Sequence, residues 1–359
     1  SNPDAGYRSR FSHAQEISKP EYYQVRLNDY DITVGLTASK RVSFHKYIFP
    51  KADDAHVLLD LGHSNYKNYT KIAHVRIIAA KSEIEGYRET EEGSKVYFVI
   101  RFNKPFDSFG TWDNEEYHRE TDESKIFPYK TDETGKKIGA FVNYRTGQDE
   151  EILVKVGISF VNIDGARNNL DTEISGWDFN KVRRDAANSW NKELSKIMVK
   201  GGTKKQRTTF YTALYHSILY RNISNDVDGK YFGMDGKIHQ TAGWDFYPDF
   251  WAWDIFRSAQ PLMTIIEKGR VRDIILSVLC KYNEMKWFPA QHYRNVFGQG
   301  MVGDHLVPIV VDAFMKGIYG YDSLVIYQAM KEKALFYPSH LDSTYGRSGL
   351  QYYLQLGYI

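Results

Sequence analysis

The hydrophobic period changes once along this sequence, and this change restricts the possible fold more than any other feature. From Tyr22 to Asn169, apolar and polar residues alternate in short runs separated by turn residues. This is the pattern of half-buried β-strands. From Asp178 onward, apolar residues recur three or four positions apart, as on one face of a helix. The sequence therefore predicts a β-domain followed by a helical domain.

Several short strands without helical stretches between them predict an antiparallel β-sandwich in the first part. The clearest strand patterns are residues 23–27, 32–36, 42–47, 96–102 and 152–156. The polar segment from Asp107 to Lys137 is expected to form a long loop or a hairpin.

The first helix after the change of period is predicted to begin at the capping residue Asp178 and to end at Gly201-Gly202. Its apolar stripe consists of Phe179, Val182, Ala186, Trp190, Leu194 and Ile197. We interpret residues 175–202 as a linker helix between a β-sandwich domain, residues 1–174, and a helical domain, residues 203–359. Further apolar stripes predict an array of α-hairpins, with members at Phe210, Leu214 and Ile218; Val271, Ile274, Ile275, Val278 and Leu279; Leu306, Ile309, Val310 and Phe314; Ile326, Ala329 and Met330.

Composition excludes several classes of protein. A chain of 359 residues is too long for one ordinary core, so two domains are expected. The net charge of +2 gives no electrostatic case for binding nucleic acid or a membrane surface. No apolar run is long enough to span a bilayer. The single cysteine, Cys280, excludes an intrachain disulfide and lies in an apolar helical run, where a buried inert thiol is expected.

The densest group of candidate functional residues lies between Gly243 and Arg257, which includes three tryptophans and three aspartates. Aromatic faces can cover the C–H face of a sugar, and a carboxylate such as Asp254 can accept hydrogen bonds from two hydroxyls. In the alternative interpretation, Trp253 belongs to the core and Asp254 forms an i,i+3 pair with Arg257.

A second candidate is Gly303-Asp304-His305, at the predicted start of a helix. His305 is either a ligand for a sugar hydroxyl or a packed histidine, and Asp304 is favourably placed for the helix dipole. The preceding glycine-rich residues 298–301 could bring backbone close to a ligand.

Residues 224–235 partly match the spacing of an EF-hand calcium loop, with Gly229 at the sixth position. The first position is Ser224 and the last is Asp235, which is too short for the usual bidentate glutamate. Hairpin turns at Asp228-Gly229 and Asp235-Gly236 are the better interpretation.

The motifs together resemble glycoside hydrolase family 92, the exo-acting α-mannosidases. Trp253-Asp254-Ile255-Phe256-Arg257 is similar to the W-D-x-F/Y-R signature of that family. Other similar segments, in the same order along essentially the whole chain, are residues 11–13, 22–23, 36–38 with Arg41, 210–216, 226–231, 301–305, 312–314 with 316–317, and 356–359.

This resemblance implies an N-terminal β-sandwich, a helical linker and part of an (α/α)6 toroid. It also implies inverting, calcium-assisted removal of terminal α-linked mannose in a periplasmic or extracellular location. By resemblance, Asp254 receives mannose hydroxyls and Trp253 frames the sugar, while Arg257, Asp304 and His305 line or orient it.

The catalytic acid and base of the family lie in motifs beyond the segment that resembles residues 356–359. We therefore expect both groups, and most calcium ligands, outside this chain, which corresponds to the N-terminal part of the family length. Glu267 and Glu284 match neither motif. Two alternatives stay open: a truncated, non-catalytic mannose-binding module, and a related α-toroid polysaccharide lyase, although the order of the motifs follows the mannosidases.

Overall fold

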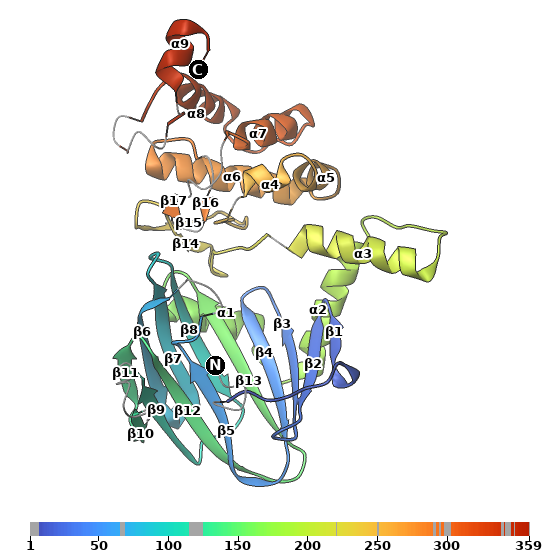
Figure 1. The fold of residues 1–359 in the computed structure, drawn as a ribbon, viewed down its shortest axis with the longest axis vertical. Helices are drawn as coiled ribbons and strands as arrows, with labels where there is room; N and C mark the ends of the chain where they lie inside the picture. The colour runs from blue at the N-terminus through green and yellow to red at the C-terminus, as the bar shows by residue number, and fades with distance from the viewer. Residues whose placement is uncertain are drawn as a thin grey trace. The chain divides into compact units, whose positions relative to one another are not determined.

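The chain forms two compact units, Ser1–Ser195 and Lys196–Ile359. The first is mainly β-structure and the second mainly helical, as the change of hydrophobic period predicts (Figure 1). The computed structural model describes residues 7–64, 69–114, 125–219, 221–249, 251–289, 292–293, 296–297, 303–338, 341, 346–347 and 349–358.

Two antiparallel sheets make up most of the first unit and confirm the predicted β-sandwich. Over the described residues, the larger sheet has nine strands in the order β1-β2-β3-β4-β13-β8-β7-β6-β11, and the smaller has four in the order β10-β9-β12-β5. The strands are β1 (Ile17–Lys19), β2 (Tyr22–Leu27), β3 (Ile32–Ala38), β4 (Val42–Phe49), β5 (Ala52–Asp60), β6 (Thr70–Ile78), β7 (Glu83–Thr90), β8 (Lys95–Phe102), β9 (Ser108–Asp113), β10 (Lys125–Pro128), β11 (Asp132–Gly135), β12 (Ile138–Thr146) and β13 (Glu150–Ser159). Short 3-10 helices occur at His13–Gln15 and Ala79–Lys81.

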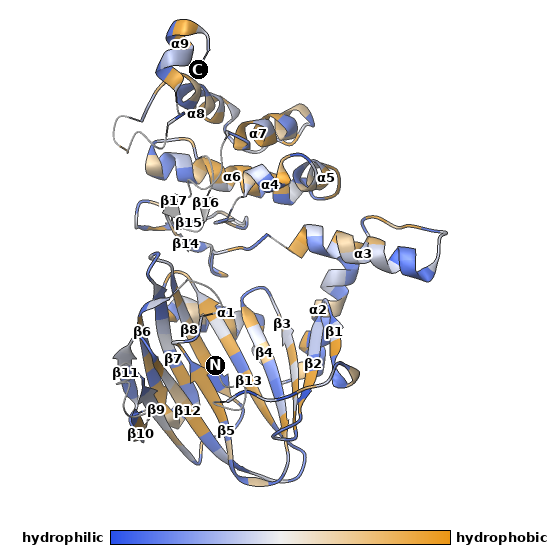
Figure 2. Ribbon diagram, viewed as in Figure 1, coloured by the Kyte–Doolittle hydropathy of each residue, from blue (hydrophilic) through white to orange (hydrophobic). Residues whose placement is uncertain are grey.

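The larger sheet is buried on both faces in its central part. On β13, Ile152 and Val154 belong to the core between the two sheets, while Leu153 belongs to a second core on the opposite face. That second core is completed by α1 (Ile163–Glu173) and α2 (Phe179–Leu194). Successive side chains of a strand point to opposite faces, so burial of both faces explains the nearly continuous apolar run of β13, coloured largely orange in Figure 2.

The first unit differs from the sequence predictions in some details, among them α1, which begins within the stretch predicted as β-structure. The segment from Asp107 to Lys137 contains β9, β10 and β11; its β9–β10 pairing agrees with the hairpin alternative, and residues 115–124 lie outside the described part. Asp178 caps α2 as predicted, because its side chain accepts a hydrogen bond from the Lys181 N–H. However, α2 ends at Leu194, and Gly201-Gly202 lie in the connection to α3, so the predicted C-terminus was wrong.

The second unit begins with the predicted helices and contains two short hairpins. Its elements are α3 (Lys204–Leu219), β14 (Lys230–Phe232), β15 (Ile238–Gln240), α4 (Ala252–Ile255), α5 (Ala259–Ile266), α6 (Lys268–Met285), β16 (His292–Tyr293), β17 (Val296–Phe297), α7 (Leu306–Met315), α8 (Ser323–Leu335) and α9 (Leu350–Leu356). The apolar stripes predicted from the sequence fall on α3, α6, α7 and α8. None of the helices formed by the described residues has the length and hydropathy needed to cross a bilayer.

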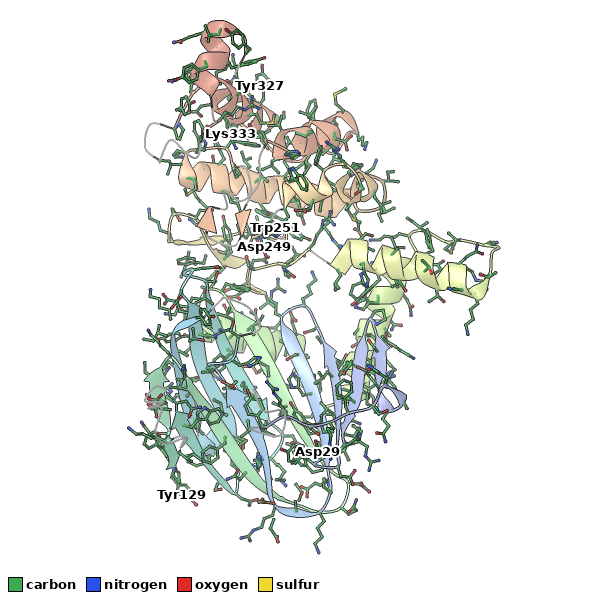
Figure 3. The ribbon with its side chains drawn as sticks, in the orientation of Figure 1. Asp29, Tyr129, Asp249, Trp251, Tyr327 and Lys333 are labelled. Atoms are coloured by element: carbon green, nitrogen blue, oxygen red, sulfur yellow. The ribbon has the colours of Figure 1, made fainter. Side chains whose placement is uncertain are left out.

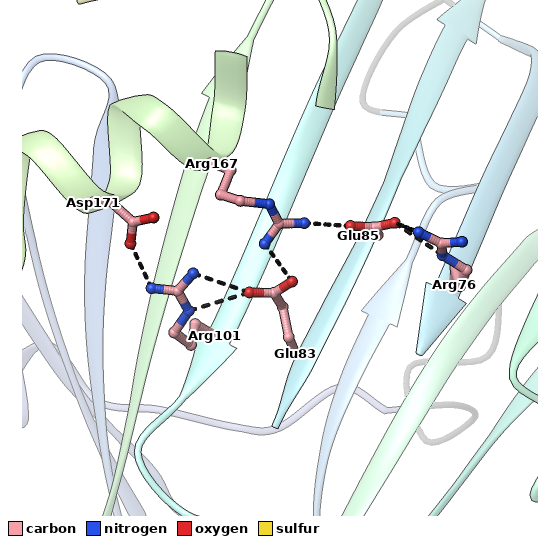
Figure 4. A network of polar contacts seen from close by, with 6 residues as sticks. All are labelled: Arg76, Glu83, Glu85, Arg101, Arg167 and Asp171. Carbon is pink, nitrogen blue, oxygen red and sulfur yellow. Dashed lines mark hydrogen bonds and ion pairs between the residues drawn. The ribbon is translucent and has the colours of Figure 1, made fainter. Parts of the chain in front are cut away.

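Buried carboxylates connect α1 to the larger sheet. Glu83, on β7, is almost fully buried; its carboxylate pairs with Arg101 at 3.0 Å and with Arg167 of α1 at 2.5 Å. Glu85 likewise pairs with Arg167 and with Arg76. Figure 4 shows this chain of ion pairs, which continues through Arg101 to Asp171. The network holds the helix in a fixed register on the sheet.

Removal of the Glu83 charge should therefore destabilise the protein. Glu83→Gln leaves two arginines without their shared buried carboxylate, and we expect a loss of about 3 kcal/mol in the free energy of unfolding. Asp171→Asn is the matched control, because Asp171 contacts the same Arg101 but is 53% exposed; we expect a loss of about 0.5 kcal/mol. Chemical denaturation measures both values, and equal losses would contradict a role for burial.

Candidate substrate-binding site

The segment from Gly243 to Arg257 presents its signature residues to solvent. Phe246 and Tyr247 are buried, and Ala252 fixes the inner side of the short helix α4. The next two positions point outward: Trp253 is 45% exposed, and Asp254 is also exposed. The sequence folds in this way because the small Ala252 allows close packing of α4, while its neighbours project from the other side.

The Asp254 carboxylate has no hydrogen-bond or ion-pair partner among the residues that the structure describes. The proposed i,i+3 pair with Arg257 is absent from this region, since α4 ends at Ile255 and the Arg257 guanidinium lies 5.0 Å from the Phe256 ring centroid. The exposed Trp253 is likewise not a core residue. The structural alternative for this motif is therefore not supported, and no described residue is bonded to the Asp254 oxygens.

The ring of His305 contacts the rings of Trp253 and Phe256, although His305 lies more than fifty positions after Trp253 in the sequence. Its ring lies 6.4 Å from the Trp253 ring and 4.2 Å from the Phe256 ring, with edge-to-face geometry in both contacts. Gly303 has φ of +95°, and a Cβ atom at this position would lie 2.3 Å from the His305 ring. The absence of a side chain at Gly303 thus makes room for the imidazole. The structure brings together Trp253, Phe256, Arg257 and His305.

Asp304 occupies a different environment from Asp254. One carboxylate oxygen lies 2.8 Å from Lys333 Nζ, in an ion pair without the angles of a directed hydrogen bond, and the other accepts a bond of 2.5 Å from Arg347. Burial raises the pKa of Asp304, but the two cations outweigh that effect and lower it. Both oxygens are thus engaged within the protein, and contact of Asp304 with a sugar stays a prediction. Lys333 is labelled in Figure 3.

The two other acidic residues weighed in the sequence are also bonded. Glu284 accepts hydrogen bonds from the Tyr231 hydroxyl and the Met234 N–H, both at 2.8 Å. Glu267 pairs with Lys196. These contacts give both carboxylates structural partners and do not mark either as a catalytic acid or base.

The loop that resembles an EF-hand forms turns around a hairpin. Gly229 has φ of +84° and donates its N–H to the Asp226 carbonyl, and Gly236 occupies the turn between β14 and β15. The hairpin interpretation is therefore confirmed for Asp235-Gly236. Within the described ranges, no three His, Cys, Asp or Glu side chains cluster so that they could hold a metal ion.

Several sequence predictions concern residues whose placement is outside the described ranges. These are residues 298–302 and the terminal Ile359. Cys280 is half-buried, and burial raises the pKa of its thiol, in agreement with the predicted lack of reactivity. The partners of Asp304, by contrast, were not predicted; the only available signal was a lysine, Lys333, on the same side of the helix as the apolar Ile326, Ala329 and Met330.

An apolar groove of about 330 Å³ lies between α7 and α8 and shares no residue with the group around Trp253 and His305. Its lining includes Val310, Phe314, Leu324 and Tyr327, and it contains no carboxylate. The lining offers hydroxyl groups but no carboxylate, so it lacks the strong charge-assisted acceptor expected for a pair of sugar hydroxyls. The candidate site is therefore the group formed by Trp253, Asp254 and His305.

The contrast between the two aspartates predicts different pH dependence of stability. Since the folded pKa of Asp304 is lowered, its stabilising contribution is present above the unfolded pKa of about 3.9 and disappears as the pH falls through the folded value. Asp304→Asn should lower the free energy of unfolding at neutral pH by about 3 kcal/mol and flatten the acid side of the stability curve. Asp254→Asn should change neither, because this carboxylate is exposed. Chemical denaturation between about pH 2 and pH 7 measures the stability of both variants. If stability falls with acid in the same way in Asp304→Asn and in the parent, the assignment is contradicted.

Comparison with known proteins places the chain in a family. Residues 1–159 match the model of the glycosyl hydrolase family 92 N-terminal domain, and residues 165–359 match the model of the glycosyl hydrolase family 92 catalytic domain. A secreted glycosidase of uncharacterised function from Arthroderma benhamiae is 26% identical over 230 residues, which cover 62% of this chain and 25% of that protein.

Solved structures give the same result. A family 92 α-mannosidase from Bacteroides thetaiotaomicron, in complex with mannoimidazole, is 31% identical with a TM-score of 0.88, over 100% of this chain and 46% of that one. An inverting mannosidase of the family from the same species is 26% identical with a TM-score of 0.86, over 98% of this chain and 46% of that one. This chain thus spans less than half the length of these relatives. With both domain models matched in order and the sandwich followed by helices, the chain belongs to glycosyl hydrolase family 92.

Proposed function

We propose that this protein removes terminal α-linked mannose from glycans and that Asp254 binds the terminal sugar. The observation that carries the proposal is the exposed Asp254 carboxylate beside the exposed indole of Trp253. Support comes from the family relative whose structure contains mannoimidazole. Family membership favours hydrolysis over the polysaccharide-lyase alternative.

Each residue of the site has a physical role in this proposal. The Asp254 oxygens accept hydrogen bonds from two adjacent hydroxyls, which a carboxylate does more strongly than a neutral acceptor. The Trp253 indole covers the C–H face of the sugar and excludes water from these bonds. His305, held by Phe256 and Trp253, offers a ring nitrogen to orient another hydroxyl, and Arg257 lines the rim.

We propose, from the family resemblance, that the groups that carry out the reaction itself lie outside this chain. We propose an inverting hydrolysis, in which one carboxylic acid protonates the leaving oxygen and a carboxylate activates water on the opposite face. These two groups are about 6.5–9.5 Å apart in inverting glycosidases. No residue of this chain is assigned to either role. Calcium would supply electrostatic stabilisation of sugar oxygens, and we propose the dependence on calcium from the family resemblance alone. A periplasmic or extracellular location is proposed on the same basis, with the secreted relative as support.

The central test is Asp254→Asn in the full-length protein, assayed with an aryl α-mannoside. Two charge-assisted hydrogen bonds of about 1.5–3 kcal/mol each correspond to a loss of at least about 100-fold in kcat/KM. Asp185→Asn is the control, since Asp185 is an exposed carboxylate on α2 and pairs only with Lys181 in the described region. We expect unchanged kinetics for the control and unchanged melting for both variants.

Two outcomes would lead to other conclusions. A parent protein that binds mannose without turnover would favour the alternative of a mannose-binding module. Full activity in Asp254→Asn would show that this carboxylate does not hold the substrate.

Calcium dependence has a separate test. Chelation with EGTA should abolish turnover of the aryl α-mannoside, and added calcium should restore it, because a divalent cation is required to stabilise charge on the sugar. Magnesium is the control cation, since it prefers fewer ligands and shorter bonds. Activity that survives complete chelation would refute this part of the proposal.

A further inference from the structure

Three polar side chains form a row along one face of α6. Asp273, Ser277 and Lys281 are four residues apart, so their side chains lie above one another on the same side of the helix. Ser277 and Lys281 are almost fully buried. Polar groups at this depth in an otherwise apolar helix need specific partners to offset their desolvation.

All three contact the extended segment that precedes the candidate site. Asp273 accepts a long bond of 3.4 Å from the Asp245 N–H, and Ser277 accepts a bond of 3.0 Å from the Tyr247 N–H. Lys281 Nζ then donates to the carbonyl oxygens of Tyr247, at 3.1 Å, and Pro248, at 2.6 Å.

The spacing of the row matches that of the segment. Four residues of helix advance about 6 Å, and two residues of extended chain advance about 6.6 Å. Asp273 and Ser277 therefore reach Asp245 and Tyr247 in succession without distortion of either element. The α6 row fixes not only the position of the segment but also its register along the helix.

The opposite side of the segment is bonded as well. Phe246 donates its N–H to the Asn225 side chain at 2.7 Å and accepts a bond from the Ser224 N–H at 3.0 Å. The Phe246 ring stacks on Tyr231 with centroids 3.8 Å apart. Residues 245–248 are thus held between α6 and the chain that leads into β14.

Lys281 is the last anchor before the site, and it is almost fully buried. Its ammonium donates to backbone carbonyls and lies 5.5 Å from the Phe246 ring; Asp249, Glu284 and Cys280 are the nearby titratable groups. Burial lowers its pKa to about 7. Only residues 249–251 separate Pro248 from α4, which carries Trp253 and Asp254; Asp249 and Trp251 are labelled in Figure 3.

We infer that Lys281 is a positioning residue for Asp254: by holding the Tyr247 and Pro248 carbonyls, it fixes the start of the short connection that sets the place of α4. This inference rests on the proposed function, in which Asp254 grips the terminal sugar. A displacement of about 1 Å at a binding group can reduce the rate about 100-fold, so loss of this anchor affects catalysis as well as stability.

The test is Lys281→Met in the full-length protein, compared with Lys155→Met. Lys155 is a matched control, because it is equally buried and donates to the Ile174 and Gly176 carbonyls, but in the β-sandwich unit. We expect both variants to melt at a lower temperature. Only Lys281→Met should lose about 10- to 100-fold in kcat/KM for an aryl α-mannoside, with mannoimidazole bound more weakly by a similar factor.

Native-state hydrogen exchange supplies a readout that does not depend on activity. The backbone amides of Tyr247 and residues 249–253 should exchange faster in Lys281→Met and at the parental rate in Lys155→Met. Equal kinetics in the two folded variants, or unchanged exchange at these amides, would overturn the inference. If Lys281→Met does not fold, Ser277→Ala, which removes one bond to the same segment, is expected to produce the same pattern with a smaller effect.

These measurements separate the inference from the function on which it rests. A parent protein without mannosidase activity or mannoimidazole binding would overturn the proposed function, while hydrogen exchange would still decide whether Lys281 holds the segment. An active parent that depends on Asp254 but not on Lys281 would overturn the positioning role alone.

Discussion

A buried segment without regular secondary structure must find hydrogen bonds for its backbone outside a helix or sheet. The residues before α4 meet this requirement through side chains of α6 and through the chain at Ser224 and Asn225. The outward projection of Trp253 and Asp254 depends on that arrangement, because an unsatisfied backbone would move toward solvent and carry α4 with it. The polar groups of α6 thus connect the stability of the helical unit to the geometry of its candidate site.

Asp254 and Asp304, the two candidate aspartates of the sequence analysis, differ in their surroundings. Asp304 lies between Lys333 and Arg347 and has a lowered pKa, whereas Asp254 is exposed and unpaired within the described residues. A carboxylate committed to internal cations has little capacity for a neutral ligand. An exposed carboxylate beside an indole can still accept hydrogen bonds from such a ligand. This contrast supports the proposal that Asp254 binds the sugar, while the ion pair of Asp304 with Lys333 links the start of α7 to α8.

Much of the fold was predictable from hydrophobic period and capping residues. Short apolar and alternating runs located β2, β3, β4, β8 and β13, and Asp178 marked the start of α2. Residues 107–137 were predicted only as a long loop or a hairpin, and the individual strands were not located because polar residues obscure their alternation. The end of α2 was misplaced because a glycine pair often ends a helix, but here the helix stops earlier, at Leu194, with Ser195 as its cap.

The site was only partly predictable, because it depends on contacts between residues far apart in the sequence. The motif at residues 253–257 identified Trp253 and Asp254, but their exposure depends on tertiary packing. The contact between His305 and Phe256 joins residues 49 positions apart, and no local pattern encodes that distance. The role of Asp273, Ser277 and Lys281 on α6 was not predicted, because most residues around them are apolar. Their spacing of four residues was visible in the sequence.

The way in which Lys281 is hydrogen-bonded has a consequence for how the site responds to ionic strength. The hydrogen bonds of Lys281 go to carbonyl oxygens in the interior, where mobile ions do not enter, while the Arg347 side chain that pairs with Asp304 is 46% exposed. Dissolved salt weakens exposed charge pairs far more than buried contacts. The alignment of residues 245–248 should therefore persist at salt concentrations that weaken the pair between Arg347 and Asp304, so the Lys281 anchor should keep its geometry in environments of widely different salinity.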